Sequence, residues 1–161
     1  MEVDSLFQIG ENVIYATQGP GVIKSIEERE FSGEMHQYYI IEMIINRMQL
    51  MIPVEKMTDA PIRPITNIKA LNHILDTFTN GQSESSDSWK ERYQKNITKM
   101  NSGDLEDCVE VVRDLSRMKQ EKTLNKSEKE MLTKAYKIMM SEMKLIEGIT
   151  PQQLENFHLS K

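Results

Sequence analysis

One apolar stretch decides the fold of the first third of the chain. It reads Tyr38-Tyr39-Ile40-Ile41-Glu42-Met43-Ile44-Ile45-Asn46-Arg47-Met48-Gln49-Leu50-Met51-Ile52-Pro53. β-Branched and aromatic residues favour strands, and the pair Asn46-Arg47 suggests a tight turn between two of them. The stretch therefore predicts a β-hairpin with strands over 38–45 and 48–53.

The residues before this hairpin add shorter strands. Segments 12–16 and 22–27 have strand character, and Gly19-Pro20-Gly21 forms a turn between them whose glycines can adopt positive φ. Ser32-Gly33-Glu34 marks the next turn. Four or five short strands with such close turns predict a small curled sheet or barrel, near the minimum size for one core.

The hydrophobic period changes after the two prolines Pro61 and Pro64, which predict a short extended connector between them. Beyond this connector, apolar residues recur at helical spacing. The signals predict five helices, which begin near Thr66 or Asn67, at Trp89, at Asp104, at Ser127 and at Pro151. A polar loop is expected over 82–87. The predicted fold class is α+β, with a small β-barrel or curled sheet over residues 1–62 and a compact all-helical domain over 66–161.

Two details of the helical half are specific enough to test. Ser127 and Glu130 have the spacing of a capping box for the fourth helix. The broad apolar face of that helix, which ends near Gly148, predicts that it is the central and most buried one.

Composition limits the class of protein. The 161 residues are 39% hydrophobic and 28% charged, which fits one ordinary domain or two small ones. No apolar run reaches the ~18 residues of a membrane span, and the start of the chain, residues 1–5, is acidic where a secretory signal is basic. The single Cys108 is expected in the core, and a reducing cytoplasm is the expected location.

The two halves of the chain differ in charge. Residues 1–60 carry ten acidic side chains against four Lys and Arg, whereas residues 61–161 carry sixteen Lys and Arg against fifteen Asp and Glu. Phosphate should repel the first half, while the second could present a basic face. If both halves bind partners, those partners should differ.

Residues suited to enzyme chemistry are scattered. His36, His73 and His158 have no partners at metal-ligand spacing, and we find no phosphate-binding glycine loop or nucleophile motif. We therefore expect a protein that is not an enzyme, with no metal, cofactor or small-molecule substrate.

Trp89, the only tryptophan, opens a helix that carries several cations. A large indole at an exposed first turn could contact an external partner, yet Trp89, Tyr93, Ile97 and Met100 also have the spacing of a core stripe. Spacing alone leaves the two roles equally open. The cations on this helix and the next are Lys90, Arg92, Lys95, Lys99, Arg113 and Arg117; Glu110 and Asp114 could pair with the last two.

The segment Met51-Ile52-Pro53 raises a similar alternative in the β domain. Pro53 cannot donate to a ladder and so marks a sheet edge, which could accept a strand from another protein or could be covered.

Several motifs together resemble the CarD/CdnL family of bacterial transcription regulators. They are Ile9-Gly10-Glu11-Asn12-Val13-Ile14-Tyr15, Gln18-Gly19-Pro20-Gly21-Val22-Ile23, Ile52-Pro53, Ser88-Trp89-Lys90-Glu91-Arg92-Tyr93, Glu110-Val111-Val112-Arg113-Asp114-Leu115 and Ser127-Glu128-Lys129-Glu130-Met131-Leu132. Their order and spacing hold from about residue 8 to 147.

The resemblance implies that the β domain is Tudor-like and docks on the lobe of the RNA polymerase β subunit, through Arg29 and the segment Met51, Ile52 and Pro53. It also implies that the helical domain contacts promoter DNA at the upstream edge of the melted bubble, without reading sequence. Trp89 then acts as a minor-groove wedge that stabilises the open complex, and the expected DNA contacts are Trp89, Lys90, Arg92, Lys95, Lys99, Arg113 and Arg117. The alternative is a protein–protein adaptor whose β module binds a transcription or repair factor and whose helices never meet DNA.

Overall fold

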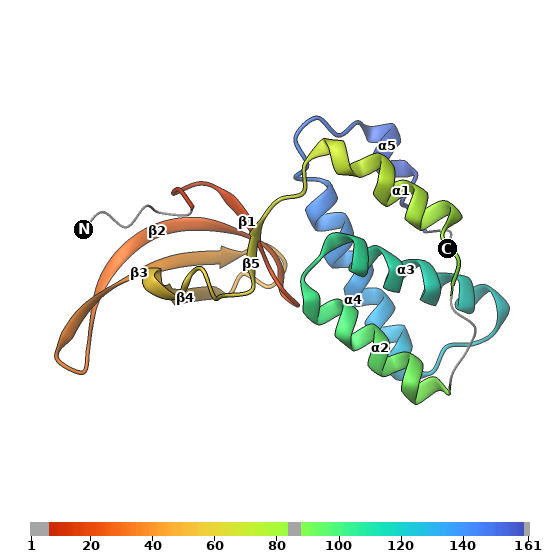
Figure 1. The fold of residues 1–161 in the computed structure, drawn as a ribbon, viewed down its shortest axis with the longest axis horizontal. Helices are drawn as coiled ribbons and strands as arrows, with labels where there is room; N and C mark the ends of the chain where they lie inside the picture. The colour runs from red at the N-terminus through yellow and green to blue at the C-terminus, as the bar shows by residue number, and fades with distance from the viewer. Residues whose placement is uncertain (1–6, 84–87, 160–161) are drawn as a thin grey trace. The chain divides into compact units, whose positions relative to one another are not determined.

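The computed structural model describes residues 7–83 and 88–159, and its contacts divide the chain into two compact units between Ile65 and Thr66. The first unit holds β1 (Asn12–Tyr15), β2 (Gly19–Phe31), β3 (Glu34–Met43), β4 (Gln49–Pro53), the 3-10 turn η1 (Val54–Lys56) and β5 (Ile62–Pro64). The second holds the 3-10 turn η2 (Ile68–Ala70), α1 (Leu71–Asn80), α2 (Trp89–Ser102), α3 (Leu105–Glu121), α4 (Lys126–Met143) and α5 (Pro151–Glu155). The α+β prediction is confirmed (Figure 1). Residues 1–5 and part of the expected loop, 84–87, lie outside the described residues.

The strands of the first unit form one antiparallel sheet in the order β4-β3-β2-β1-β5. The segment between Pro61 and Pro64 is extended, as predicted, and Ile62–Pro64 also pairs with β1 as an edge strand, which the sequence did not indicate. Proline is compatible with this position, since an edge strand has one side that needs no N–H donor. β4 lies at the opposite edge and pairs with β3 alone among the described strands.

β2 and β3 are much longer than their apolar residues suggest. They pair as far as Phe31 and Glu34 and form a curved hairpin that extends beyond the other strands (Figure 1). Ser32 and Gly33 both have positive φ, as the two central residues of a tight hairpin turn require. Polar residues occupy both faces of this extension, so it lacks the alternation by which a strand is recognised.

The turn between β3 and β4 is also longer than predicted. β3 ends at Met43, so Ile44 and Ile45 belong to the turn and not to a strand. Arg47 has φ of 62°, and the Met43 N–H donates to the Met48 carbonyl across 2.8 Å where the ladder resumes.

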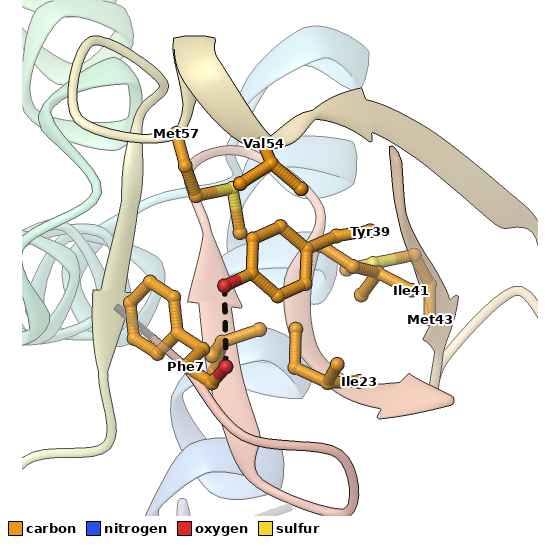
Figure 2. Packing of buried hydrophobic residues seen from close by; sticks show 8 residues of the cluster. Phe7, Ile23, Tyr39, Ile41, Met43, Val54 and Met57 are labelled. Atoms are coloured by element: carbon orange, nitrogen blue, oxygen red, sulfur yellow. Dashed lines mark hydrogen bonds between the residues drawn. The ribbon is translucent and has the colours of Figure 1, made fainter. Parts of the chain in front are cut away.

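The core of the β unit gathers on one face of the sheet (Figure 2). Tyr39 lies at its centre, fully buried, and its hydroxyl donates to the Phe7 carbonyl at 3.2 Å. The other buried members are Phe7, Val13, Ile23, Ile41, Met43, Val54 and Met57. Leu50 and Ile52 of β4 pack against this cluster, so that β4 turns alternate side chains to the core and to the opposite face.

In the second unit, α3 is the central helix, since it packs against α1, α2 and α4. The prediction that the fourth helix holds this place is wrong, although both helices bury a long apolar face. Cys108 is buried on α3, as predicted.

The helix termini match the sequence signals with one exception. Asp104 caps α3, and Thr150 with Gln153 forms a capping box before Pro151 at the start of α5. α4, however, begins two residues earlier than its predicted capping box: Asn125, not Ser127, is the cap, and its side chain accepts from the Glu128 N–H at 2.8 Å. Among the described residues, no helix is long and apolar enough to cross a membrane.

Candidate functional site

The strand register brings three of the four predicted docking residues of the β unit onto one face of the sheet. Met51 lies opposite Ile40, and Pro53 opposite Tyr38, on the face away from the core. Tyr38 in turn lies opposite Glu27 of β2, from which Arg29 is two residues along the same face. The accessible residues on this side, Arg29, Phe31, Tyr38, Met51 and Pro53, are called the outer face below; Ile40, which has the same orientation, is only 5% exposed. Ile52 points the other way, into the core.

The backbone of β4 adds a second feature to this surface. The hydrogen bond from the Met43 N–H to the Met48 carbonyl fixes the alternation of the antiparallel ladder, so Leu50 and Ile52 bond to β3. The N–H and carbonyl of Met51 therefore point to the open edge, whereas Pro53 offers a carbonyl without an N–H. This edge has the chemistry to accept one short strand.

Arg29 is held in place by its own strand. Its guanidinium donates to the Glu27 carboxylate at 2.6 Å, and about half of the side chain is exposed. Hydrogen bonds from the Ser25 hydroxyl and from Arg29 lower the pKa of Glu27. A carboxylate that stays ionised keeps the arginine directed along the outer face.

Phe31 is a candidate that sequence reasoning missed. It is 68% exposed and lies two residues beyond Arg29 on the outer face. Met35, which is 60% exposed at the same hairpin tip, faces the other way because it pairs with Glu30. The signal in the sequence was an aromatic beside Ser32-Gly33, but without the register its face was unknown.

Trp89 is the first residue of α2 and is 47% exposed. Ser88 caps the helix by accepting from the Glu91 N–H, and the indole contacts the Tyr93 ring with 6.3 Å between centroids. Of the predicted core stripe, Tyr93, Ile97 and Met100 are half-buried. The exposed fraction of Trp89 distinguishes it from these three, so the indole is accessible although it contacts Tyr93. Its contact with an external partner stays a prediction.

Arg92, one turn further on, is turned toward α4. Its Nε and Nη2 atoms donate to the two carboxylate oxygens of Glu128, at 2.9 and 3.1 Å. Glu128 is 2% exposed and Arg92 17%. The hydrogen bonds from Arg92 to Glu128 raise the pKa of the guanidinium, and burial opposes them.

The three lysines of α2 lie at different depths. Lys90 and Lys95 are exposed, whereas Lys99 is half-buried and forms an ion pair with Glu110 of α3 at 3.7 Å. Two exposed lysines that sequence reasoning did not single out, Lys126 and Lys129, flank Glu128. The Arg92–Glu128 contact places the first turn of α4, which carries both lysines, beside the first turn of α2.

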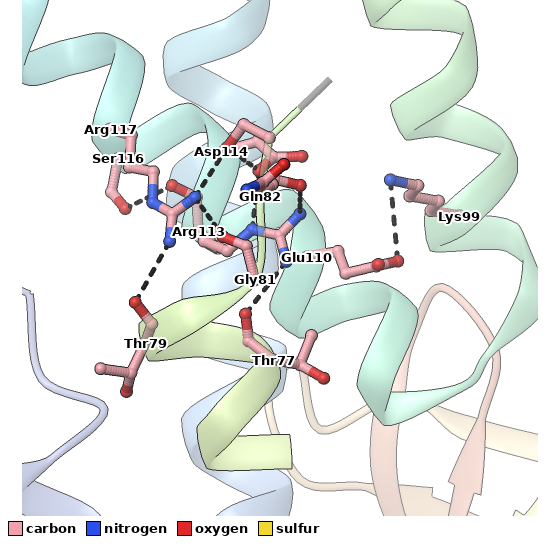
Figure 3. Close-up of polar contacts among 11 residues, drawn as sticks. Thr77, Thr79, Gly81, Gln82, Lys99, Glu110, Arg113, Asp114, Ser116 and Arg117 are labelled. Carbon is pink, nitrogen blue, oxygen red and sulfur yellow. Dashed lines mark hydrogen bonds and ion pairs between the residues drawn. The ribbon is translucent and has the colours of Figure 1, made fainter. Parts of the chain in front are cut away.

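Arg113 and Arg117 face the C-terminus of α1 instead of solvent (Figure 3). Arg113 is 5% exposed and donates to Asp114 at 2.8 Å, to the Thr77 carbonyl at 3.0 Å and to the Gln82 carbonyl at 3.3 Å. Arg117 donates to the Gly81 carbonyl at 2.6 Å. Cations favour helix C-termini, whose last carbonyls lack partners. The guanidinium of Arg113 thus has almost no surface left for an external phosphate.

Residues for metal or acid–base chemistry are not brought together. Across residues 7–83 and 88–159, no three or more His, Cys, Asp or Glu side chains are grouped so as to hold a metal ion. The exposed aromatic and apolar side chains, the open strand edge and the surface lysines are the features of a binding protein.

Comparison with known proteins defines its class more closely. The family model described as "CarD-like/TRCF RID domain" matches residues 7–66, and that described as "CarD, C-terminal domain" matches residues 73–158. A Bacillus subtilis (strain 168) protein described as "Putative transcription factor YdeB" is 48% identical over 152 residues, which is 94% of this chain and 99% of the relative. The chain therefore belongs to the CarD family, and this membership indicates a role in transcription.

Proposed function

We propose that this protein regulates transcription initiation by binding the lobe of the RNA polymerase β subunit and stabilising the promoter open complex. The β unit supplies the polymerase contact through the outer face and the open edge of β4. The helical unit supplies the DNA contact, with Trp89 as a wedge in the minor groove at the upstream edge of the bubble. The observation that carries the proposal is an indole that is half exposed on the first residue of a capped helix.

The first step in support is the chemistry of the wedge. Apolar side chains inserted between base steps pay a cost of unstacking, which is smallest where the bases are already separated. An aromatic ring has a face on which any base can stack, so no sequence need be read. The edge of a melted bubble offers both conditions.

The second step concerns the phosphate contacts. We assign these to Lys90, Lys95 and Lys99, with the exposed Lys126 and Lys129 beside them, because phosphate contacts by lysine position a protein on DNA without carrying sequence information. Arg113, and Arg117 in part, hold the end of α1 instead. Few cations and a net charge of −5 predict weak binding to DNA alone. Tethering through the polymerase raises the local concentration of the helical unit at the promoter.

The third step concerns the polymerase contact. The apolar edge of β4 fits a partner strand that brings apolar side chains. Arg29 lies on β2, separated from β4 by β3, and would meet a carboxylate of the partner on the outer face. Met51 supplies apolar contact and both backbone groups, Arg29 supplies charge, and Phe31 extends the apolar surface. Ile52 contributes through its place in the strand, since its side chain is in the core.

The DNA role is tested with Trp89→Ala in the full chain, measured as open-complex lifetime on a promoter limited by bubble collapse. Losing base stacking worth about 1–3 kcal/mol should shorten the lifetime about fivefold or more. Ile68→Ala truncates another exposed apolar side chain of the helical unit and should leave the lifetime unchanged. An unchanged lifetime for Trp89→Ala, with polymerase binding intact, would exclude the wedge and leave the adaptor role.

The docking surface is tested with Phe31→Ser and Arg29→Glu, measured as affinity for core polymerase in the absence of DNA. Each should weaken binding about tenfold or more, as expected when an exposed aromatic anchor or an arginine that a partner covers is lost. Met35→Ser is the matched control, because Met35 is nearly as exposed on the opposite face of the same hairpin tip. Equal effects of Phe31→Ser and Met35→Ser would show that the outer face is not the docking surface.

A further inference from the structure

The contact between Arg92 and Glu128 joins the first turns of two helices. Arg92 lies one turn from the cap of α2, with its N–H bonded to the Ser88 carbonyl at 3.0 Å. Glu128 lies in the first turn of α4, where Asn125 has already satisfied its N–H. Both oxygens of the Glu128 carboxylate accept from the Arg92 guanidinium.

Apolar packing does little to fix the first turn of α2. The one fully buried residue of this helix is Asn96, two turns after Trp89, while Trp89, Lys90 and Glu91 are all exposed. Tyr93, which contacts the indole, is itself only half-buried. A helix start with so few buried apolar groups frays readily unless a specific contact holds it.

We propose that Arg92 is a positioning residue: its two-pronged ion pair with Glu128 fixes the first turn of α2 and thereby the direction in which Trp89 projects. This inference rests on the proposed wedge for its functional meaning. It gives Arg92 a role different from a phosphate contact, because both prongs of its guanidinium are committed to a carboxylate that is 2% exposed.

The geometry makes the pair specific to arginine. A guanidinium presents two parallel N–H groups to the two oxygens of a carboxylate, whereas a lysine ammonium is a point charge on a flexible stem. Arg92→Lys therefore keeps the charge of α2 but loses the orientation. Glu128→Gln removes a negative charge from the face near the DNA and also loses the orientation.

The two roles of Arg92 thus predict opposite results for Glu128→Gln. If Arg92 contacted phosphate, freeing it from Glu128 and deleting a carboxylate would strengthen DNA binding. If Arg92 positions Trp89, the same change shortens the open-complex lifetime toward that of Trp89→Ala.

The direct experiment is time-resolved fluorescence anisotropy of the full chain without polymerase, because Trp89 is the only tryptophan. Glu128→Gln and Arg92→Lys should each lower the residual anisotropy of the indole, while circular dichroism shows that the helices are retained. Glu110→Gln is the control, since it removes the same charge opposite the same helix at Lys99, about three turns from Trp89. It should leave the anisotropy unchanged. If Glu128→Gln fails to fold, Arg92→Lys, which keeps a cation against Glu128, carries the test.

The second experiment measures open-complex lifetime and its salt dependence with the same variants. We expect Arg92→Lys and Glu128→Gln to shorten the lifetime with the salt slope unchanged, because no phosphate contact is lost. A longer lifetime for Glu128→Gln, or anisotropy equal to that of the unmodified protein in both variants, would overturn the inference. If Trp89→Ala itself has no effect on lifetime, the wedge fails while the anisotropy result still decides whether Arg92 positions the indole.

Discussion

Replacement of Arg113 by methionine should strongly lower the stability of the helical unit. Its effect on DNA binding should be far smaller. Arg113→Met keeps most of the aliphatic volume and removes three hydrogen-bond donors from a site that is 5% exposed. Their acceptors are Asp114 and the carbonyls of Thr77 and Gln82, at 2.8 to 3.3 Å.

The size of the expected loss in stability depends on the acceptor groups that Arg113→Met leaves without a donor. Removing one partner of a buried ion pair costs about 3–5 kcal/mol, because the other charge remains without compensation. Asp114 retains the Ser83 hydroxyl and one fifth of its side chain surface, so water recovers part of this cost. The Thr77 carbonyl also accepts from the Gly81 N–H and is not orphaned. We therefore expect a loss of about 2–4 kcal/mol in the free energy of unfolding.

The assay is urea and thermal unfolding of the full chain, followed by circular dichroism at a helix-sensitive wavelength. For a unit of this size the expected loss lowers the melting temperature by about 10–20 °C. Arg117→Met is the comparison, since Arg117 is less buried and caps the Gly81 carbonyl of the same helix; we expect it to cost about 1 kcal/mol. The reasoning is refuted if Arg113→Met costs no more than Arg117→Met. If instead Arg113→Met leaves stability intact and lowers the salt slope of promoter binding by about one, Arg113 contacts a phosphate.

Two further substitutions test the local structure of the helical unit by the same unfolding measurement. Gly81→Ala should cost about 1–3 kcal/mol although Gly81 has an ordinary φ of −61°, because an added Cβ would collide with Nη1 of Arg113 and the carbonyl of Thr77; a neutral effect would mean that the guanidinium can move aside at no cost. Asn125→Ala should cost about 1 kcal/mol and Ser127→Ala less than about 0.5 kcal/mol, because Asn125 is the cap of α4; the reverse order would show that α4 starts where the capping box Ser127–Glu130 places it.

The start of α4 could not be predicted from local sequence alone. Asn125 with Glu128 and Ser127 with Glu130 have the same spacing, so the sequence offers two equivalent capping patterns. The structure uses the first, and the decisive contacts are distant: Leu124 is buried, and Glu128 meets Arg92 across 36 residues. The starts of α2, α3 and α5 were predictable because each has one local cap and no equivalent pattern two residues away: Ser88, Asp104 and Thr150.

In the sheet, the length of the β2–β3 hairpin and the face that its residues occupy could not be predicted from the sequence. β-Branched and aromatic residues identified β3 and β4, but the hairpin extension at 27–37 carries polar residues on both faces and gives no period-2 signal. Its pairing depends on the turn at Ser32 and Gly33. That pairing decides which face Phe31 and Met35 occupy, so the outer face could be identified only from the register. Arg113 illustrates the same limit among the helices, because a cation that caps a distant helix has the same spacing as one on a solvated face.

A wedge has to satisfy two requirements that normally conflict, since a side chain gains order by burial and a binding side chain must stay accessible. For Trp89 the conflict is resolved by separating the two tasks between neighbouring residues. The indole keeps nearly half of its surface exposed, while Arg92, three residues later, is held by a carboxylate with almost no exposure. A preorganised indole would lose less conformational entropy on insertion than one on a fraying turn, so more of its stacking energy would remain to oppose bubble collapse. The same argument explains why weak cationic contacts suffice. If the β unit holds the polymerase, the helical unit need not find DNA by affinity, and a rigid aromatic group contributes more to open-complex lifetime than additional phosphate contacts would.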